Sequence, residues 1–115
     1  MSFNLFLDDQ RFPKEVFECL NIKIYQTDDW VIVRNFSEFV SYVEIHGLPS
    51  IISFDNDISD FKDGVEKTGY DCAKWLCDYC QDNNLKFPDW HIHSGNSVGV
   101  ENIKTYIENY KKIVE

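Results

Sequence analysis

The sequence predicts an α/β fold: a three-layer sandwich in which a mainly parallel four-stranded sheet carries helices on both faces. Three observations predict it. Short apolar runs alternate with amphipathic segments, an arrangement typical of parallel strands joined by right-handed crossovers. Hydrophobic residues make up 43% of the chain and aromatic residues 16%, which is typical of a packed core. Because a chain of 115 residues is too short for several cores, residues 1–115 are expected to form one domain. The expected strand order in its sheet is 2-1-3-4.

The first strand is predicted over residues 3–7, a short apolar run that ends at two adjacent aspartates. Buried parallel strands commonly have such continuous apolar sequences. The chain then turns at Pro13, and residues 14–20 are predicted to form a short helix. Residues 21–29 predict no single element, because the alternation of apolar and polar residues breaks there at another pair of aspartates.

The second strand is predicted over residues 30–34. Asn35 and Ser37 are candidate N-caps for the helix that follows, whose apolar residues share one face. Gly47 stands where helices commonly end, since glycine adopts the required backbone conformation without strain. The third strand is predicted over residues 51–54, which again precede acidic residues.

Residues 58–68 are polar and charged and are expected to form a long loop. A helix is predicted over residues 69–82, and Pro88 precedes the fourth strand, residues 89–93. Apolar residues spaced three or four apart predict a last helix over residues 100–114.

Charge and composition limit the classes of partner. The chain has 11 basic and 20 acidic residues, a net charge of −9, so we expect no extended nucleic-acid binding and no membrane binding. The N-terminal residues do not read as a signal peptide, and no apolar run could span a bilayer, which predicts a cytoplasmic protein. Surface positions are expected for acids such as Glu66, Asp82, Glu101 and Glu108.

The cysteine pattern does not predict a metal site. The chain has four cysteines: Cys19, Cys72, Cys77 and Cys80. Only the last two form a C-x-x-C pair, and the spacing of the others does not complete a tetrahedral zinc site. Buried, reduced thiols are therefore the expected state, with a redox or metal role as the alternative.

Polar residues follow the first, third and fourth predicted strands. In a parallel α/β sheet these segments meet at the carboxyl edge, where ligands bind near the reversal of strand order. The residues expected to converge there are Asp8, Asp9, Arg11, Asp55, Asp57, His93, Ser94 and Asn96. One pocket would thus combine three distant segments.

Four aspartates in one pocket repel each other, which raises their pKa values unless the charge is balanced. A divalent cation such as Mg²⁺ or Mn²⁺ could hold them ionised, with Asp9, Asp55 and Asp57 as candidate ligands. Alternatively, one aspartate stays protonated and acts as a proton donor near neutral pH. The residue pattern leaves both alternatives open.

The remaining residues of this group predict a phosphate-containing ligand. His93, at the end of its strand, is a candidate acid, base or oxyanion donor. Arg11 could bind a phosphate through two hydrogen bonds. Ser94 and Asn96 belong to a glycine-containing turn before the last helix, and the free amides at the start of a helix bind anions.

Four segments of the sequence resemble those of a known protein family. In chain order they are LFLDDQRFP, ISFDND, TGYDCAKWL and HSGNSVGVENI. Over residues 5–110 the chain resembles the cyclic-phosphate processing receiver-like family, which is related to response-regulator receiver domains. The resemblance implies a reduced receiver-like fold that processes cyclic phosphates, such as 2′,3′-cyclic RNA ends. By position, the family's functional elements fall on Asp8, Asp9 and Arg11, on Asp55 and Asp57, and on His93, Ser94 and Asn96.

The chain departs from the family pattern at two positions. Asn56 stands where the family often has histidine between two acids, which removes a possible proton carrier. Ser97 stands where proline often follows the asparagine of the fourth motif, which changes the stiffness of the turn.

Three functions are compatible with these residues. The leading hypothesis is a phosphoesterase that opens a cyclic phosphodiester on a nucleotide or RNA end, with catalytic roles for Asp8, Asp9, Asp55, Asp57 and His93. The second is a non-catalytic cyclic-nucleotide-binding or sequestering protein. The third is a degenerate phospho-acceptor receiver that uses Asp55, although the chain has no fifth strand to carry the lysine that receivers place after one.

Overall fold

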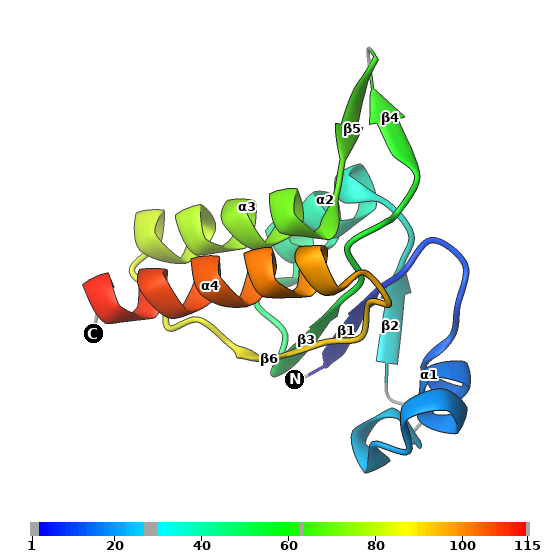
Figure 1. Cartoon of the computed structure of the whole chain (residues 1–115). Coiled ribbons are helices and arrows are strands. Elements are labelled where there is room, and N and C mark those ends of the chain that lie inside the picture. The colour runs from blue at the N-terminus through cyan, green and yellow to red at the C-terminus, as the bar shows by residue number, and fades with distance from the viewer. Residues whose placement is uncertain (1–2, 27–29, 63, 115) are drawn as a thin grey trace.

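A computed structural model describes residues 3–26, 30–62 and 64–114 (Figure 1). Its central sheet consists of β1 (Asn4–Leu7), β2 (Trp30–Val33), β3 (Ile51–Phe54) and β6 (Asp89–Ile92). All pairings in this sheet are parallel, and the order is β2-β1-β3-β6. Because β6 is the fourth strand of the sheet, the predicted order 2-1-3-4 is confirmed.

Three helices cover one face of the sheet: α2 (Phe36–His46), α3 (Gly69–Asp82) and α4 (Ser97–Val114). They bury an apolar core against every second residue of the strands, because successive side chains of a strand point to opposite faces. Leu5, Ile52 and Phe54 are fully buried in this core.

The opposite face is covered by the shorter helix α1 (Pro13–Leu20) and the 3-10 helix η1 (Lys23–Gln26). Phe6 points to this side and packs with Val16, Tyr25 and Trp30 in a second, smaller cluster. The sheet therefore lies between two helical layers, as predicted.

Local sequence signals set the ends of α2. The side chain of Asn35 accepts a hydrogen bond from the amide of Glu38 at 2.9 Å, so Asn35, and not Ser37, is the N-cap. Gly47 ends the helix with a φ of 86°, a conformation that favours glycine.

Residues 58–68 differ from the prediction of a long loop. They contain an antiparallel hairpin, β4 (Asp60–Lys62) and β5 (Val65–Lys67), that projects from the body of the domain (Figure 1). Strands of three residues are too short to show an alternating pattern. Within residues 21–29, which predicted no element, η1 covers 23–26, whereas 27–29 lie outside the described residues.

Three of the four cysteines are buried free thiols, as predicted. Burial raises the pKa of Cys77 to about 12 and that of Cys80 to about 11, so both stay protonated and unreactive. Cys72 is also buried, but Cys19 is exposed, and for Cys19 the prediction of burial was wrong.

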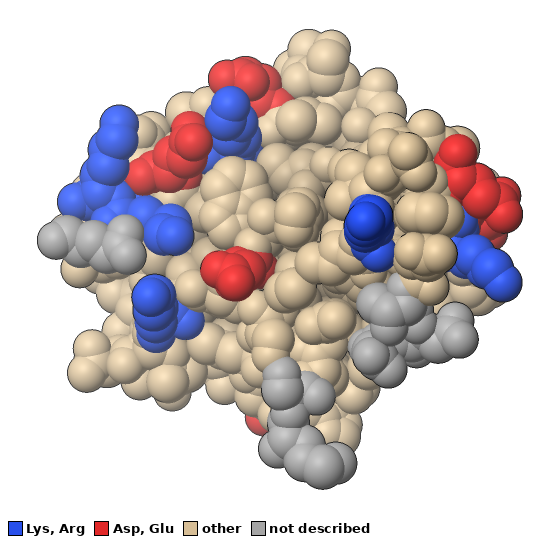
Figure 2. Space-filling view, turned by 90° about the horizontal axis from the view of Figure 1, so that it is seen from below, with Lys and Arg blue, Asp and Glu red and all other residues tan. Residues whose placement is uncertain are grey.

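The surface carries charges of both signs. Glu66, Asp82, Glu101 and Glu108 are exposed, as expected. Figure 2 shows acidic and basic side chains interspersed on one face. Among the described residues, no helix has the length and apolar character needed to cross a membrane.

Candidate functional site

The segments after β1, β3 and β6 meet at the carboxyl edge of the sheet. They enclose an open pocket of about 380 Å³ lined by Asp8, Asp9, Gln10, Arg11, Asp55, Asp57, Ser94, Gly95 and Asn96. Seven of the eight predicted site residues line it, and the eighth, His93, lies beneath it, buried. Gln10 and Gly95 were not predicted, because neither carries a group that marks a site in sequence.

Asp8 is saturated with hydrogen-bond donors. Its Oδ1 accepts from the backbone amides of Gln10 and Arg11, both at 2.9 Å. Its Oδ2 accepts from Nε of Arg11 at 3.0 Å and lies 3.1 Å from Nε2 of His93. Burial alone would raise the pKa of Asp8, but the hydrogen bonds with His93, Arg11 and Gln10 outweigh it and hold the pKa below its usual range.

Two arginines hold the loop after β1. Nη2 of Arg11 donates to the backbone carbonyl of His93 at 2.9 Å, which ties this loop to the end of β6. Nη1 of Arg34 donates to the carbonyls of Asp8 and Arg11 at 2.9 and 2.6 Å. Arg34 was missed in the sequence, since it directly follows a strand but belongs to no motif.

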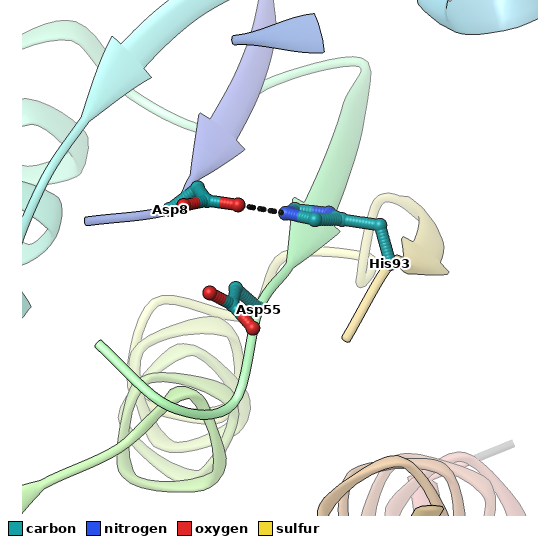
Figure 3. Close-up of side chains that lie close together, drawn as sticks. All are labelled: Asp8, Asp55 and His93. Carbon is teal, nitrogen blue, oxygen red and sulfur yellow. Dashed lines mark hydrogen bonds and ion pairs between the residues drawn. The ribbon is translucent and has the colours of Figure 1, made fainter. Parts of the chain in front are cut away.

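His93 has no ring nitrogen facing the pocket. Its Nε2 contacts Asp8 (Figure 3), and its Nδ1 lies 2.6 Å from Oγ of Ser53. The ring stacks on Phe6 with centroids 4.4 Å apart and an interplanar angle of 6°. Burial lowers the pKa of His93, and the neighbouring Asp8 offsets this only in part, so the imidazole is neutral.

Asp55 has the opposite surroundings. Its carboxyl group lies beside the Asp8–His93 pair (Figure 3), and only 7% of the residue is exposed. Burial and then the negative charge of Asp8 raise its pKa to about 6, although the positive charge of Arg11 opposes this. Asp55 is therefore the pocket residue whose proton is exchangeable near neutral pH.

Asn96 organises the third segment. Its Oδ1 accepts from the amide of Gly99 at 3.0 Å and so caps α4, while its Nδ2 donates to Oδ2 of Asp57 at 3.2 Å. The hydroxyl of Ser94 accepts from the amide of Asn96 at 3.1 Å. These contacts join the exposed Asp57 to the start of α4.

Two glycines allow the loop after β3 to lie against the starts of α3 and α4. A Cβ on Gly69 would lie 1.8 Å from the carbonyl oxygen of Asp55, and one on Gly99 would lie 2.5 Å from the side chain of Asn56. Asn56, the position where the family often has histidine, is buried, and its Oδ1 has no hydrogen-bond partner among the described residues. The position of Asp55 thus depends on close backbone packing.

A family model described as "Cyclic-phosphate processing Receiver domain" matches residues 3–109. The chain belongs to this family. The resemblance drawn from the four sequence segments is therefore confirmed, and so is the receiver-like α/β fold. No curated protein matches the chain.

The residues that the family model matches, 3–109, include every residue that lines the pocket. Within the described residues, Asp8, Asp55 and His93 each place a potential ligand atom within 4.8 Å of the others. The carboxylates are oxygen donors of the kind that Mg²⁺ and Mn²⁺ prefer, but both nitrogens of His93 already have protein partners. Asp9 and Asp57, predicted as ligands together with Asp55, line the pocket outside this cluster.

Proposed function

We propose that the domain is a phosphoesterase that opens 2′,3′-cyclic phosphates on a nucleotide or a short RNA end. One observation carries the proposal: Asp8 and Asp55 lie close together in the pocket, and Asp8 is surrounded by hydrogen-bond donors whereas Asp55 is buried beside its negative charge. Their pKa values are therefore shifted in opposite directions. Asp8 is ionised, whereas Asp55, with a pKa of about 6, is available to gain and lose a proton. Such divergent pairs are typical of acid–base sites.

In this proposal Asp55 acts as the general acid. Water adds to phosphorus, the bond between phosphorus and one ribose oxygen breaks, and the proton of Asp55 passes to the leaving oxygen. The proton released by the attacking water returns to Asp55 and completes the cycle. Arg11, Ser94 and Asn96 orient the phosphate, and orientation is a large part of phosphoryl-transfer catalysis.

The proposed role of His93 differs from that of a direct proton carrier. Its side chain is buried and both ring nitrogens have protein partners, so its proposed role is to hold the Asp8 carboxylate in place through their hydrogen bond. Proton transfer to substrate falls to Asp55, which lines the pocket.

The surplus of negative charge in the pocket favours either a bound cation or a protonated aspartate. Four aspartates and Arg11 line it, so a phosphate anion is repelled unless a proton or a metal ion balances the charge. A divalent cation held by Asp9, Asp55 and Asp57 would neutralise charge on the phosphoryl oxygens. With the cation bound, Asp55 would be a ligand instead of an acid, so the two arrangements are alternatives that a chelator separates.

The deciding experiment is hydrolysis of 2′,3′-cyclic nucleotides and of RNA oligonucleotides with cyclic ends, with and without chelator. We expect turnover by the wild type and its loss in Asp55→Asn. Asp82→Asn, which removes an exposed carboxylate at the far end of α3, is the matched control and should retain activity. Stoichiometric binding with recovery of intact ligand would instead establish a sequestering protein.

The phospho-acceptor alternative has less support. Among the described residues the parallel sheet ends at β6, and no fifth strand is present to carry a lysine beside Asp55. A stable acyl-phosphate on Asp55 after incubation with a small phosphodonor would overturn this preference.

A further inference from the structure

A chain of buried hydrogen bonds runs beneath the pocket. Oη of Tyr25 lies 2.6 Å from Oγ of Ser53, which lies 2.6 Å from Nδ1 of His93. Nε2 of His93 completes the chain at 3.1 Å from Asp8. Neither Tyr25 nor Ser53 lines the pocket. Tyr25 lies outside the four segments that carry the resemblance, and Ser53 lies within ISFDND, where no role was predicted for it.

The position of Ser53 is unusual for a purely structural residue. Ser53 lies inside β3 between Ile52 and Phe54 and is fully buried. Tyr25 is 1% exposed. Burying a hydroxyl group costs free energy unless it is hydrogen-bonded, and both hydroxyls here have a partner within the chain. An apolar residue at position 53 would leave Nδ1 of the buried His93 without its partner.

The contacts allow one direction for every hydrogen bond. Nε of Arg11 and two backbone amides are donors only, so Asp8 is the acceptor of the set, and Nε2 of His93 carries the ring proton. Nδ1 of His93 is then an acceptor, to which the hydroxyl of Ser53 donates. Ser53 in turn accepts from Tyr25, whose pKa is raised by burial, so that it keeps its proton.

Aromatic contacts restrict the imidazole further. Phe6 stacks on one side of His93, and Tyr25 meets it edge-on with centroids 6.1 Å apart. Tyr25 is itself stacked on Trp30 at 5.5 Å. The ring of His93 is thus held in its plane by packing, and its tautomer, which Asp8 sets, is stabilised by the hydrogen bond from Ser53.

We propose that Tyr25 and Ser53 are positioning residues, which act through His93 to fix the orientation of the Asp8 carboxylate at the pocket. The expected effect on catalysis rests on the proposed function, in which Asp55 is the general acid and the ionised Asp8 is held in a fixed orientation beside it. Its structural content, one tautomer of His93 that the hydroxyl of Ser53 stabilises, stands independently of turnover.

The test is long-range ¹H–¹⁵N NMR of the histidine rings at a single pH. The chain has three histidines, so His46→Gln and His91→Gln variants assign the signals of His93. We expect the wild type to show one neutral tautomer with the proton on Nε2. Ser53→Ala should shift both ring-nitrogen signals toward an exchange average, Tyr25→Phe should do so to a smaller extent, and Ser53→Thr, which keeps a hydroxyl, should restore the wild-type signals.

Matched controls remove hydroxyl groups elsewhere: Ser41→Ala on the exposed side of α2 and Tyr42→Phe beside it should leave the signals of His93 unchanged. Unchanged signals in folded Ser53→Ala, or a proton on Nδ1 in the wild type, would overturn the proposal. If Ser53→Ala does not fold, Tyr25→Phe decides alone by the same criterion.

Activity gives a second readout. We expect kcat to fall about tenfold in Tyr25→Phe with KM unchanged, since partners that orient a functional group typically contribute 10- to 100-fold. A wild type with the expected tautomer and no hydrolysis would refute the proposed phosphoesterase while leaving the fixed tautomer in place. Full activity in a Tyr25→Phe protein whose His93 signals have shifted would refute the catalytic part of the positioning role.

Discussion

Asp8 and Asp55 follow adjacent strands, β1 and β3, and line the same pocket, yet the two loops that carry them give them different neighbours. The loop after β1 turns its own amides and the guanidinium of Arg11 onto Asp8. The loop after β3 is pressed against the starts of two helices and leaves Asp55 buried beside a like charge.

The comparison teaches that the number of donors, and not burial, decides which aspartate is reactive. Both residues are buried, and burial raises the pKa of both. Only Asp8 has enough hydrogen bonds to reverse that effect. One loop therefore provides a fixed negative charge, and the other provides a proton.

The largest expected effect is on turnover, at Asp55. Asp55→Asn removes the proposed proton donor, so kcat for a 2′,3′-cyclic nucleotide should fall by about 10²- to 10⁴-fold, the range typical of general acids. Steady-state kinetics measure this, with Asp82→Asn as the matched control. Activity of Asp55→Asn within a factor of two of wild type would end the assignment of Asp55 as the acid.

The next largest effect is on stability, at Asp8. Asp8→Ala leaves the buried Nε2 of His93 and the partly buried Nε of Arg11 without their acceptor, which should lower the free energy of unfolding by about 3 kcal/mol. Urea denaturation measures the loss. The exposed Asp89→Ala should cost less than about 0.5 kcal/mol, and equal losses at the two sites would contradict the account of Asp8.

The close packing behind Asp55 can be tested at Gly69. Gly69→Ala places a Cβ against the carbonyl of Asp55, and we expect a loss of about 2 kcal/mol, because backbone cannot move aside as a flexible side chain does. Gly95→Ala is the control, since a Cβ there meets no atom within 4 Å. Thermal melts of the two variants should differ clearly; if they coincide, the loop after β3 is not tightly packed.

The smallest effect has the opposite sign to that at Asp8. The folded state holds the Asp55 proton more tightly than the unfolded chain, with a pKa of about 6 against 3.8. The associated stability is full below pH 3.8 and is lost as the pH rises to about 6. Removing this ionisable group should therefore stabilise the fold at pH 7.

We expect Asp55→Asn to raise the free energy of unfolding at pH 7 by about 1.5 kcal/mol, half of the roughly 3 kcal/mol that such a shift is worth, because a buried amide keeps part of the cost of burial. The charged groups that shift the pKa of Asp55 are Asp8, Asp9 and Arg11. Denaturation from pH 3.5 to 7 in chelator should show a shallower pH dependence for Asp55→Asn than for wild type. An identical pH profile would show that Asp55 is not the titrating group.

Much of the site was predictable, because strand ends in a parallel sheet share one edge. The apolar runs at β1, β3 and β6 located the pocket, and the polar residues that follow them line it, apart from His93. The hairpin in residues 58–68 was not predictable, since its strands are too short for a pattern. Arg34 was missed because its partners, two backbone carbonyls, leave no trace in sequence.

The sequence by itself determined the strands of the central sheet, the helices that connect them, their order and the residue types that meet at the carboxyl edge, because these follow from local periodicity and chain topology. Only the tertiary structure decided how those residues differ. The hydrogen bonds that link His93 to Ser53 and to Asp8 join residues 40 and 85 positions apart, and no local pattern encodes such pairs. A pKa depends on which donors and charges surround a buried group, and for Asp8 and Asp55 the three-dimensional packing sets both.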